Sequence, residues 1–229
     1  MTKQQNEDLL QRIVPYLLLN YSFVEDNSLL YGKMGGVLFF NLYARATGQH
    51  YYRQYADELF DSITETLSIA SPIDFGWGLC GIGWGVEYII RNGLQDGNTD
   101  DLLEEIDRAV MVRDPLRFTD MSFDTGLKGM LFYITTRMSS SKRQRPFAPF
   151  DQPYLDALSE TVRKNMDRIP KGLSTHYQTL LSGGGSYGRP MIFPGEAFGK
   201  LPQPCVDFDT LPIGIKGGLT GLALKVVLS

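Results

Sequence analysis

Hydrophobic positions along the chain follow helical patterns of two kinds. In the first kind, apolar residues recur every three or four positions along one face, as over 6–20, 50–69 and 153–168, which predicts amphipathic helices. In the second kind, nearly every position is apolar and a glycine pair comes first, as in the stretch that follows Gly32. A helix that is apolar all round has to be buried. Because no run of strand length alternates apolar and polar residues, the pattern predicts an all-α protein.

The glycine pairs recur at a nearly constant spacing. The first glycine of a Gly-x-x-Gly pair stands at Gly32, Gly78, Gly126 and Gly218, so the gaps are 46, 48 and 92 residues. The last gap is twice 46, and Gly172 lies halfway along it, where the second glycine is missing. A period between 20 and 50 residues is typical of repeat architectures. We interpret the chain as five repeats of about 46 residues, each an amphipathic helix, a loop and a glycine-led apolar helix.

Five such hairpins predict an α/α toroid over residues 1–229 as a single domain, with glycine-led helices inside and amphipathic helices outside. A glycine near a helix start costs about 1 kcal/mol against alanine. We therefore expect the glycines where inner helices converge on the axis and leave no room for a Cβ. Convergent helix N-termini would also form a central cup that favours anions. The segment 183–215, with five prolines and seven glycines, replaces an outer helix and is expected to form a loop that acts as a lid.

Composition and charge narrow the classes of function. The net charge of −4 and the lack of an extended basic face argue against a nucleic-acid partner. No apolar run reaches the length of a membrane span and the N-terminus shows no signal-peptide pattern, so we expect a soluble, cytoplasmic protein without a membrane partner. The two cysteines, Cys80 and Cys205, stand far apart, which argues against a disulfide framework.

The glycine-led helices resemble those of the lanthionine synthetase C-like (LanC-like) family. The resemblance is clearest over 78–82 (Gly-Leu-Cys-Gly-Ile) and 218–222 (Gly-Leu-Thr-Gly-Leu), and as a repeat pattern it covers most of the chain. It implies an α/α toroid with a central cavity. Zinc-binding members of the family use that cavity to add cysteine thiolates of a precursor peptide to dehydrated Ser and Thr residues.

The resemblance does not extend to the zinc ligands. Zinc catalysis of this kind needs three protein ligands, usually Cys and His. In the family, one cysteine stands two residues before a Gly-x-x-Gly and a Cys-His pair directly precedes another, whereas Cys80 lies inside its glycine pair and cannot inherit that role. We therefore expect no metal and no cofactor. The positions two and one before the first glycines, none of them Cys or His, are Leu30 and Tyr31, Gly76 and Trp77, Asp124 and Thr125, Pro170 and Lys171, and Lys216 and Gly217.

Five residues near the glycine pairs are candidates for a binding site. Trp77 and Trp84 flank the second pair and are expected on the wall of a cavity built by at least three repeats. Asp74, Asp124 and His176 would add polar groups to it. An aromatic wall with a few convergent polar groups is typical of a small-molecule or peptide pocket. The structural alternative for both aspartates is an N-cap role at the start of the following helix.

Two further candidates lie within the glycine-led helix that follows Gly78. Cys80 is a candidate ligand-binding thiolate activated by the helix N-terminus, or else a small buried hydrophobe. Glu87 stands in an otherwise apolar helix, where a carboxylate needs a partner. An ion pair with Arg91 at i+4 would supply one. Otherwise Glu87 joins Asp124 and His176 as a candidate catalytic residue.

Three classes of function stay open. The first is a zinc-less LanC-like protein that binds a peptide as an accessory in the modification of ribosomally made peptides. The second is a glycan-active α/α-toroid enzyme whose carboxylates are Asp74, Asp120, Asp124 and Glu87. The third is a non-catalytic scaffold that forms a homo-oligomer through exposed aromatic residues. We rank them in this order, and the expected partner is a peptide or a small molecule.

Overall fold

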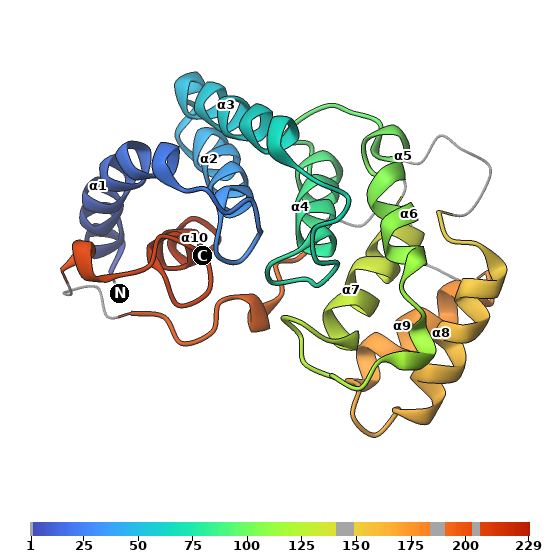
Figure 1. The fold of residues 1–229 in the computed structure, drawn as a ribbon. Coiled ribbons are helices and arrows are strands. Elements are labelled where there is room, and N and C mark those ends of the chain that lie inside the picture. The colour runs from blue at the N-terminus through green and yellow to red at the C-terminus, as the bar shows by residue number, and fades with distance from the viewer. Residues whose placement is uncertain (1, 141–148, 184–190, 203–206) are drawn as a thin grey trace. The chain divides into compact units, whose positions relative to one another are not determined.

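The computed structural model describes residues 2–140, 149–183, 191–202 and 207–229. Within these ranges the regular structure is helical, with no β-strand, as the sequence predicts (Figure 1). No helix in the described ranges has both the length and the apolar character that a membrane crossing requires. The α-helices are α1 (Lys3–Asn20), α2 (Lys33–Thr47), α3 (His50–Thr66), α4 (Leu79–Arg91), α5 (Thr99–Leu102), α6 (Glu104–Val112), α7 (Leu127–Met138), α8 (Gln152–Lys164), α9 (Lys171–Leu181) and α10 (Leu219–Val227).

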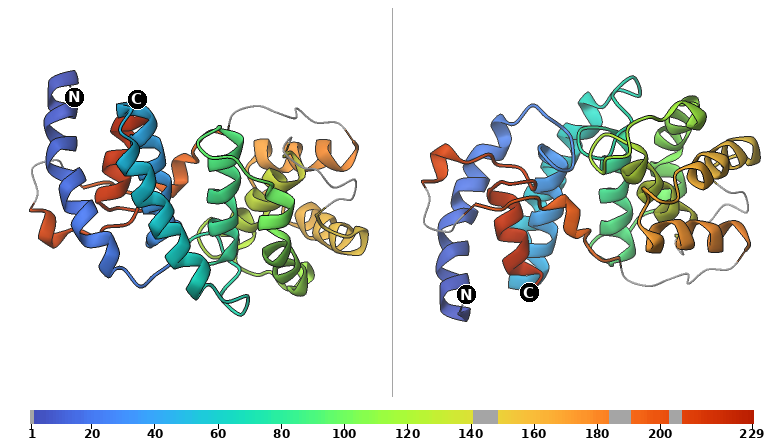
Figure 2. Two further views of the ribbon diagram at one scale, coloured as in Figure 1. Left: turned by 90° about the horizontal axis from the view of Figure 1, so that it is seen from above. Right: turned by 90° about the horizontal axis from the view of Figure 1, so that it is seen from below.

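Contacts divide the chain into two compact units. The first unit consists of residues 1–67 together with 193–229, and in it α10 packs between α1 and α2 while α3 packs on α2 (Figure 2). The second unit is the continuous segment 68–192, in which α7 packs against both α4 and α9. The first unit therefore joins the two ends of the chain.

Four helices, α2, α4, α7 and α10, begin in the same way. Each has the first glycine of its pair as N-cap, with φ values of −123°, −123°, −112° and −120° in chain order. The next residue donates its N–H to the carbonyl oxygen six positions before the glycine, at 2.7 to 2.9 Å. The repeat unit predicted from the glycine spacing is thus one recurring loop geometry. These hydrogen bonds run from Lys33 to Asp26, from Leu79 to Pro72, from Leu127 to Asp120 and from Leu219 to Pro212.

The need for glycine arises inside this loop, not primarily from helices that converge on an axis as we expected. A Cβ on Gly126 would lie 2.5 Å from the carbonyl oxygen of Asp120 and 2.6 Å from the amide nitrogen of Ser122. On Gly129, the second glycine of that pair, it would lie less than 3.0 Å from the carbonyl oxygen of Phe123. In both cases the nearest atom belongs to the backbone six residues earlier, so the loop folds back too closely for any side chain.

The fourth predicted repeat departs from this pattern. The N-cap of α9 is Pro170, and Gly172 is the second residue inside the helix. A Cβ on Gly172 would meet no other described part of the chain within 4 Å. The prediction that Gly172 is equivalent to the other first glycines is therefore wrong, because no loop folds back on the start of α9.

Loops of different repeats also dock on each other through equivalent positions. Gly76 donates its N–H to the carbonyl oxygen of Asp124 at 2.7 Å, and each of these residues stands two positions before its N-cap glycine. The same two positions connect the last repeat with the first, because Lys216 donates its N–H to the carbonyl oxygen of Leu30 at 3.0 Å. The second repeat therefore contacts the third as the fifth contacts the first.

The glycine- and proline-rich segment 183–215 contains no α-helix in its described part, as predicted. Two short 3-10 turns interrupt it, at Gly195–Ala197 and Phe208–Thr210. Residues 184–190 and 203–206, which include Cys205, lie outside the described residues.

Candidate ligand pocket

A pocket of ≈ 450 Å³ lies in the second unit between α4, α7 and α9. Aromatic and aliphatic side chains make up much of its lining, and no Asp or Glu is among the described residues that line it. Residues from the second, third and fourth predicted repeats contribute to the wall. They are Trp84 and Arg91 of α4, Phe132, Thr135, Thr136 and Ser139 on or just after α7, Gly172, Leu173 and His176 of α9, and then Met191 and Ile192.

The aromatic part of the wall follows from the shared start of α4 and α7. The two helices begin with docked equivalent loops and run side by side in the same direction, so equivalent positions come together. Trp84 and Phe132 each stand six residues after their N-cap glycine, and their ring centroids are 5.9 Å apart with planes inclined by 31°. Trp84 is fully buried.

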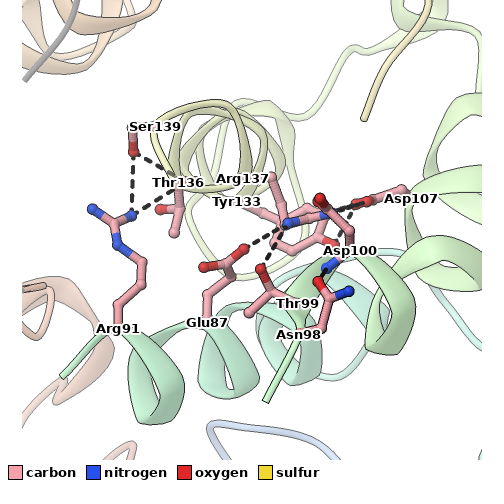
Figure 3. A network of polar contacts seen from close by, with 10 residues as sticks. All are labelled: Glu87, Arg91, Asn98, Thr99, Asp100, Asp107, Tyr133, Thr136, Arg137 and Ser139. Atoms are coloured by element: carbon pink, nitrogen blue, oxygen red, sulfur yellow. Dashed lines mark hydrogen bonds and ion pairs between the residues drawn. The ribbon is translucent and has the colours of Figure 1, made fainter. Parts of the chain in front are cut away.

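A positive charge lies beside this wall, at the C-terminal end of α7. The guanidinium of Arg91 donates through Nη1 to the carbonyl oxygen of Thr136 and to Oγ of Ser139, each at 3.3 Å (Figure 3). The last carbonyls of a helix carry partial negative charge, so a cation is favourable there. Arg91 therefore caps the neighbouring helix, which fixes its charge at the edge of the pocket.

His176 lies in the second turn of α9 and adds a polar group to the same pocket. Burial, and then the charge of Arg91, lower the pKa of His176 below its ordinary value of 6.5. The imidazole is therefore mainly neutral near pH 7, with one nitrogen as donor and the other as acceptor.

The hydroxyl groups of the pocket lining donate their hydrogen bonds to backbone carbonyl oxygens of α7. Thr135 donates to the carbonyl oxygen of Leu131 at 2.9 Å, and Thr136 donates to that of Phe132 at 2.8 Å. Ser139 Oγ in turn donates to the carbonyl oxygen of Thr136 at 3.0 Å. Toward a ligand these hydroxyls can offer lone pairs, so the donors for a bound anion have to come from elsewhere.

Met191 and Ile192, which belong to the glycine- and proline-rich segment 183–215, form one edge of the pocket. Met191 donates its N–H to Oδ1 of Asn92 at 3.1 Å and accepts a hydrogen bond from Nδ2 of Asn92 at 3.4 Å. Asn92 is the C-cap of α4. This two-point attachment holds Met191 and Ile192 at the pocket edge.

Beyond the pocket lining, side chains of α4, α5, α6 and α7 form a buried ionic network centred on Arg137 (Figure 3). Its guanidinium lies 2.6 Å from Oε1 of Glu87, 2.7 Å from Oδ2 of Asp107 and 3.4 Å from Oδ1 of Asp100. The predicted ion pair of Glu87 with Arg91 is wrong, because its direct partner is Arg137 from the neighbouring repeat, and Arg91 acts on Glu87 through longer-range attraction.

The network contains three carboxyl groups and one guanidinium. Burial raises the pKa of both Glu87 and Asp107 above their ordinary values, and Arg137 acts in the opposite direction. The hydroxyl of Tyr133 donates to Oδ1 of Asp107 at 2.6 Å, which also stabilises the charged form. Glu87 is therefore fixed within the core, which does not favour a catalytic role for it.

Of the candidate site residues, the structure places Trp84 and His176 on the pocket and gives the others different surroundings. Asp74 accepts the N–H of Trp77 at Oδ1, at 2.7 Å, within the loop before α4. The N-cap alternative is wrong for both aspartates, because Gly78 and Gly126 are the N-caps of α4 and α7 and neither helix has a side-chain capping hydrogen bond. Trp77 is 49% exposed. Cys80 is fully buried, and burial raises the pKa of its thiol, which agrees with the alternative that Cys80 is a small buried hydrophobe. Asp124 is near enough to Asp74 to raise its pKa, although burial raises it more.

The pocket is therefore not at the helix starts, where we expected a cup. Asp74 and Asp124 belong to the loops before α4 and α7, whereas Trp84 and Arg91 lie in the middle and at the end of α4. α9 contributes its first two turns to the pocket, so its start lies where α4 and α7 end. Arg91 is a pocket residue that the sequence analysis did not place on a cavity, because it considered this residue only as an ion-pair partner of Glu87.

A second pocket of ≈ 630 Å³ in this unit lies between residues 69–73 and α6 with Arg113, and its lining includes none of the candidate residues. Across the described residues, no three His, Cys, Asp or Glu side chains are grouped so that they could hold a metal ion. Comparison of the chain with protein-family models, curated proteins and solved structures finds no match in any of the three.

Proposed function

We propose that the chain is a LanC-like α/α toroid without a zinc site that binds a peptide, as an accessory in the modification of ribosomally made peptides. The observation that carries the proposal is the pocket between α4, α7 and α9. Its described residues offer an aromatic wall and a fixed positive charge but no carboxylate, which is typical of a binding site more than of a hydrolase.

The contacts between repeats support the toroid over residues 1–229. In an open array the last repeat has no successor, yet here Lys216 of the fifth repeat docks on Leu30 of the first. That contact uses the same two positions as the contact from Gly76 to Asp124 between the second and third repeats. A cyclic order of repeats accounts for both contacts with one rule.

The glycan-active alternative has less support because its carboxylates already have structural partners. Glu87 pairs with Arg137 in the core. Asp74 accepts a backbone N–H of its own loop, and Asp120 accepts the N–H of Ser122 at 2.7 Å. None of these groups lines the pocket.

Fluorescence of Trp84 tests the proposal. Trp77→Phe leaves Trp84 as the only tryptophan of the chain, and Trp84 lines the pocket. We expect overlapping synthetic peptides from a precursor encoded beside the gene to change this fluorescence in a saturable way, with scrambled peptides as the control. Equal responses to native and scrambled peptides, or no response to any, would contradict peptide binding.

A metal analysis tests the zinc-less part of the proposal separately. Natively purified protein should contain far less than one zinc per chain. One tightly bound zinc per chain that is lost in Cys80→Ala or His176→Ala would contradict it.

A further inference from the structure

The pocket between α4, α7 and α9 combines apolar walls with a net positive lining. Phe132 and Leu173, both partly exposed, supply apolar surface, and the fully buried ring of Trp84 lies next to that of Phe132. Arg91 is permanently charged, none of the described lining residues is acidic, and His176 is mainly neutral near pH 7. A ligand that fills this pocket therefore meets one positive charge that its own negative charge would complement.

The start of α9 adds hydrogen-bond donors to the same place. The first amides of a helix have no partner inside the helix and carry partial positive charge. Pro170, the N-cap of α9, has no side-chain capping hydrogen bond, and two residues later no other described part of the chain comes within 4 Å of the position of a Cβ on Gly172. A ligand atom can thus approach the backbone in the first turn of α9 where a larger residue would block it.

We propose that this pocket binds a free carboxylate attached to an apolar or aromatic group, as in the C-terminal residue of a peptide. The carboxylate lies toward Arg91 and the start of α9, and the side chain lies against Phe132 and Leu173, close to the buried Trp84. The volume of ≈ 450 Å³ falls within the range of about 300–1,000 Å³ that small-ligand pockets span. The inference rests on the proposed function and names the part of the peptide that is recognised.

A charge-matched pair of small probes tests this specificity. N-acetylphenylalanine and its amide share ring and backbone and differ by one negative charge. In the Trp77→Phe background we expect the acid to bind at least tenfold more tightly than the amide, as read from Trp84 fluorescence. Arg91→Lys should keep most of this preference, whereas Arg91→Gln should abolish it and leave binding of the amide nearly unchanged.

The histidines provide a readout that does not depend on any change to Arg91. The chain has only two, and His50 is exposed and outside the pocket. In NMR titrations, bound N-acetylphenylalanine should raise the pKa of His176, because a nearby negative charge favours the imidazolium, and should leave that of His50 unchanged. Equal movement of both, or of neither, would overturn the proposed placement.

The remaining outcomes separate this inference from the proposed function. If precursor peptides bind but acid and amide probes do so equally, or neither probe does, peptide binding stands and carboxylate recognition fails. If inorganic phosphate or acetate competes as well as N-acetylphenylalanine, the site is a simple anion site and the apolar part of the proposal fails. If precursor peptides do not bind while the acid does, the proposed function fails and the pocket accepts a small apolar acid.

Discussion

Alanine at Gly126 and alanine at Gly172 should change stability in opposite directions, although the sequence gives both glycines the same place in the repeat. At Gly126 the new Cβ would lie 2.5 Å from the carbonyl oxygen of Asp120, whereas real Cβ atoms essentially never come closer than 3.0 Å. The loop has to move by about half an ångström or more, and the hydrogen bond from Leu127 to Asp120 holds it in place. The backbone of Gly126 itself is extended, so steric crowding and not φ is the cost.

The magnitude follows from two terms. Overpacking typically costs 1–3 kcal/mol, and weakening of one hydrogen bond costs about 1 kcal/mol more, so Gly126→Ala should lose about 3 kcal/mol. For a chain of this size that lowers Tm by roughly 6–12 °C. Gly172→Ala meets open space inside a helix and should gain up to about 1 kcal/mol from helix propensity.

Urea unfolding followed by far-UV circular dichroism, with thermal melts in parallel, measures both changes. Both variants add one methyl group at the start of a helix of the second unit, Gly126→Ala at the N-cap of α7 and Gly172→Ala in the first turn of α9. Each variant therefore serves as the control for the other. Similar destabilisation of both would mean that glycine is required by the repeat as a whole. No destabilisation at Gly126 would refute the conclusion that the loop folds back too closely for a side chain.

Two further predictions concern buried groups of the second unit. Arg137→Met leaves Glu87 and Asp107 buried without their ion pair and should cost about 3–5 kcal/mol at pH 7. Burial raises the pKa of both carboxyls, and the variant lacks the charge of Arg137 that lowers them. Its folded form therefore binds protons more readily than the unfolded chain does, so the loss of stability should shrink as the pH falls from 7 toward 5. The same loss in urea melts at both pH values would contradict this reasoning. In Cys205→Ser, the buried Cys80 should react with a thiol reagent at pH 8 only after unfolding, since burial raises the pKa of its thiol, and rapid reaction of the native protein would show an accessible thiolate.

The glycine spacing predicted the starts of four helices because its cause is local. A loop that folds back six residues leaves its mark within the same stretch of sequence, at the N-cap glycine and three residues later. Spacing alone failed at Gly172, since a glycine at the right distance does not show whether a loop packs on it. Pro170 indicated the difference. It stands two positions before Gly172, where Gly76 and Lys216 of other repeats each donate a backbone N–H to the loop of another repeat, and proline has no N–H to donate.

The partners of polar residues were harder to predict because they come from other repeats. Glu87 finds its partner in Arg137, 50 residues along the chain, while sequence reasoning looked one turn ahead on the same helix. Trp84 and His176 were predicted on one cavity from their position near glycines, and they do line one. Its location at the helix ends depends on how α9 packs, which no local pattern records.

The division of the first unit between both ends of the chain sets an order of events during synthesis on the ribosome. Residues 68–192 form a continuous unit whose contacts are all available once that stretch has left the exit tunnel. Helices α1 and α2 emerge earlier but pack on α10, which is translated only after the whole second unit. Since domains generally fold as units while the chain grows, α1 and α2 have to wait without this packing partner until α10 has been made. The apolar faces of α1 and α2 that α10 covers are therefore exposed for as long as the whole second unit takes to be synthesised.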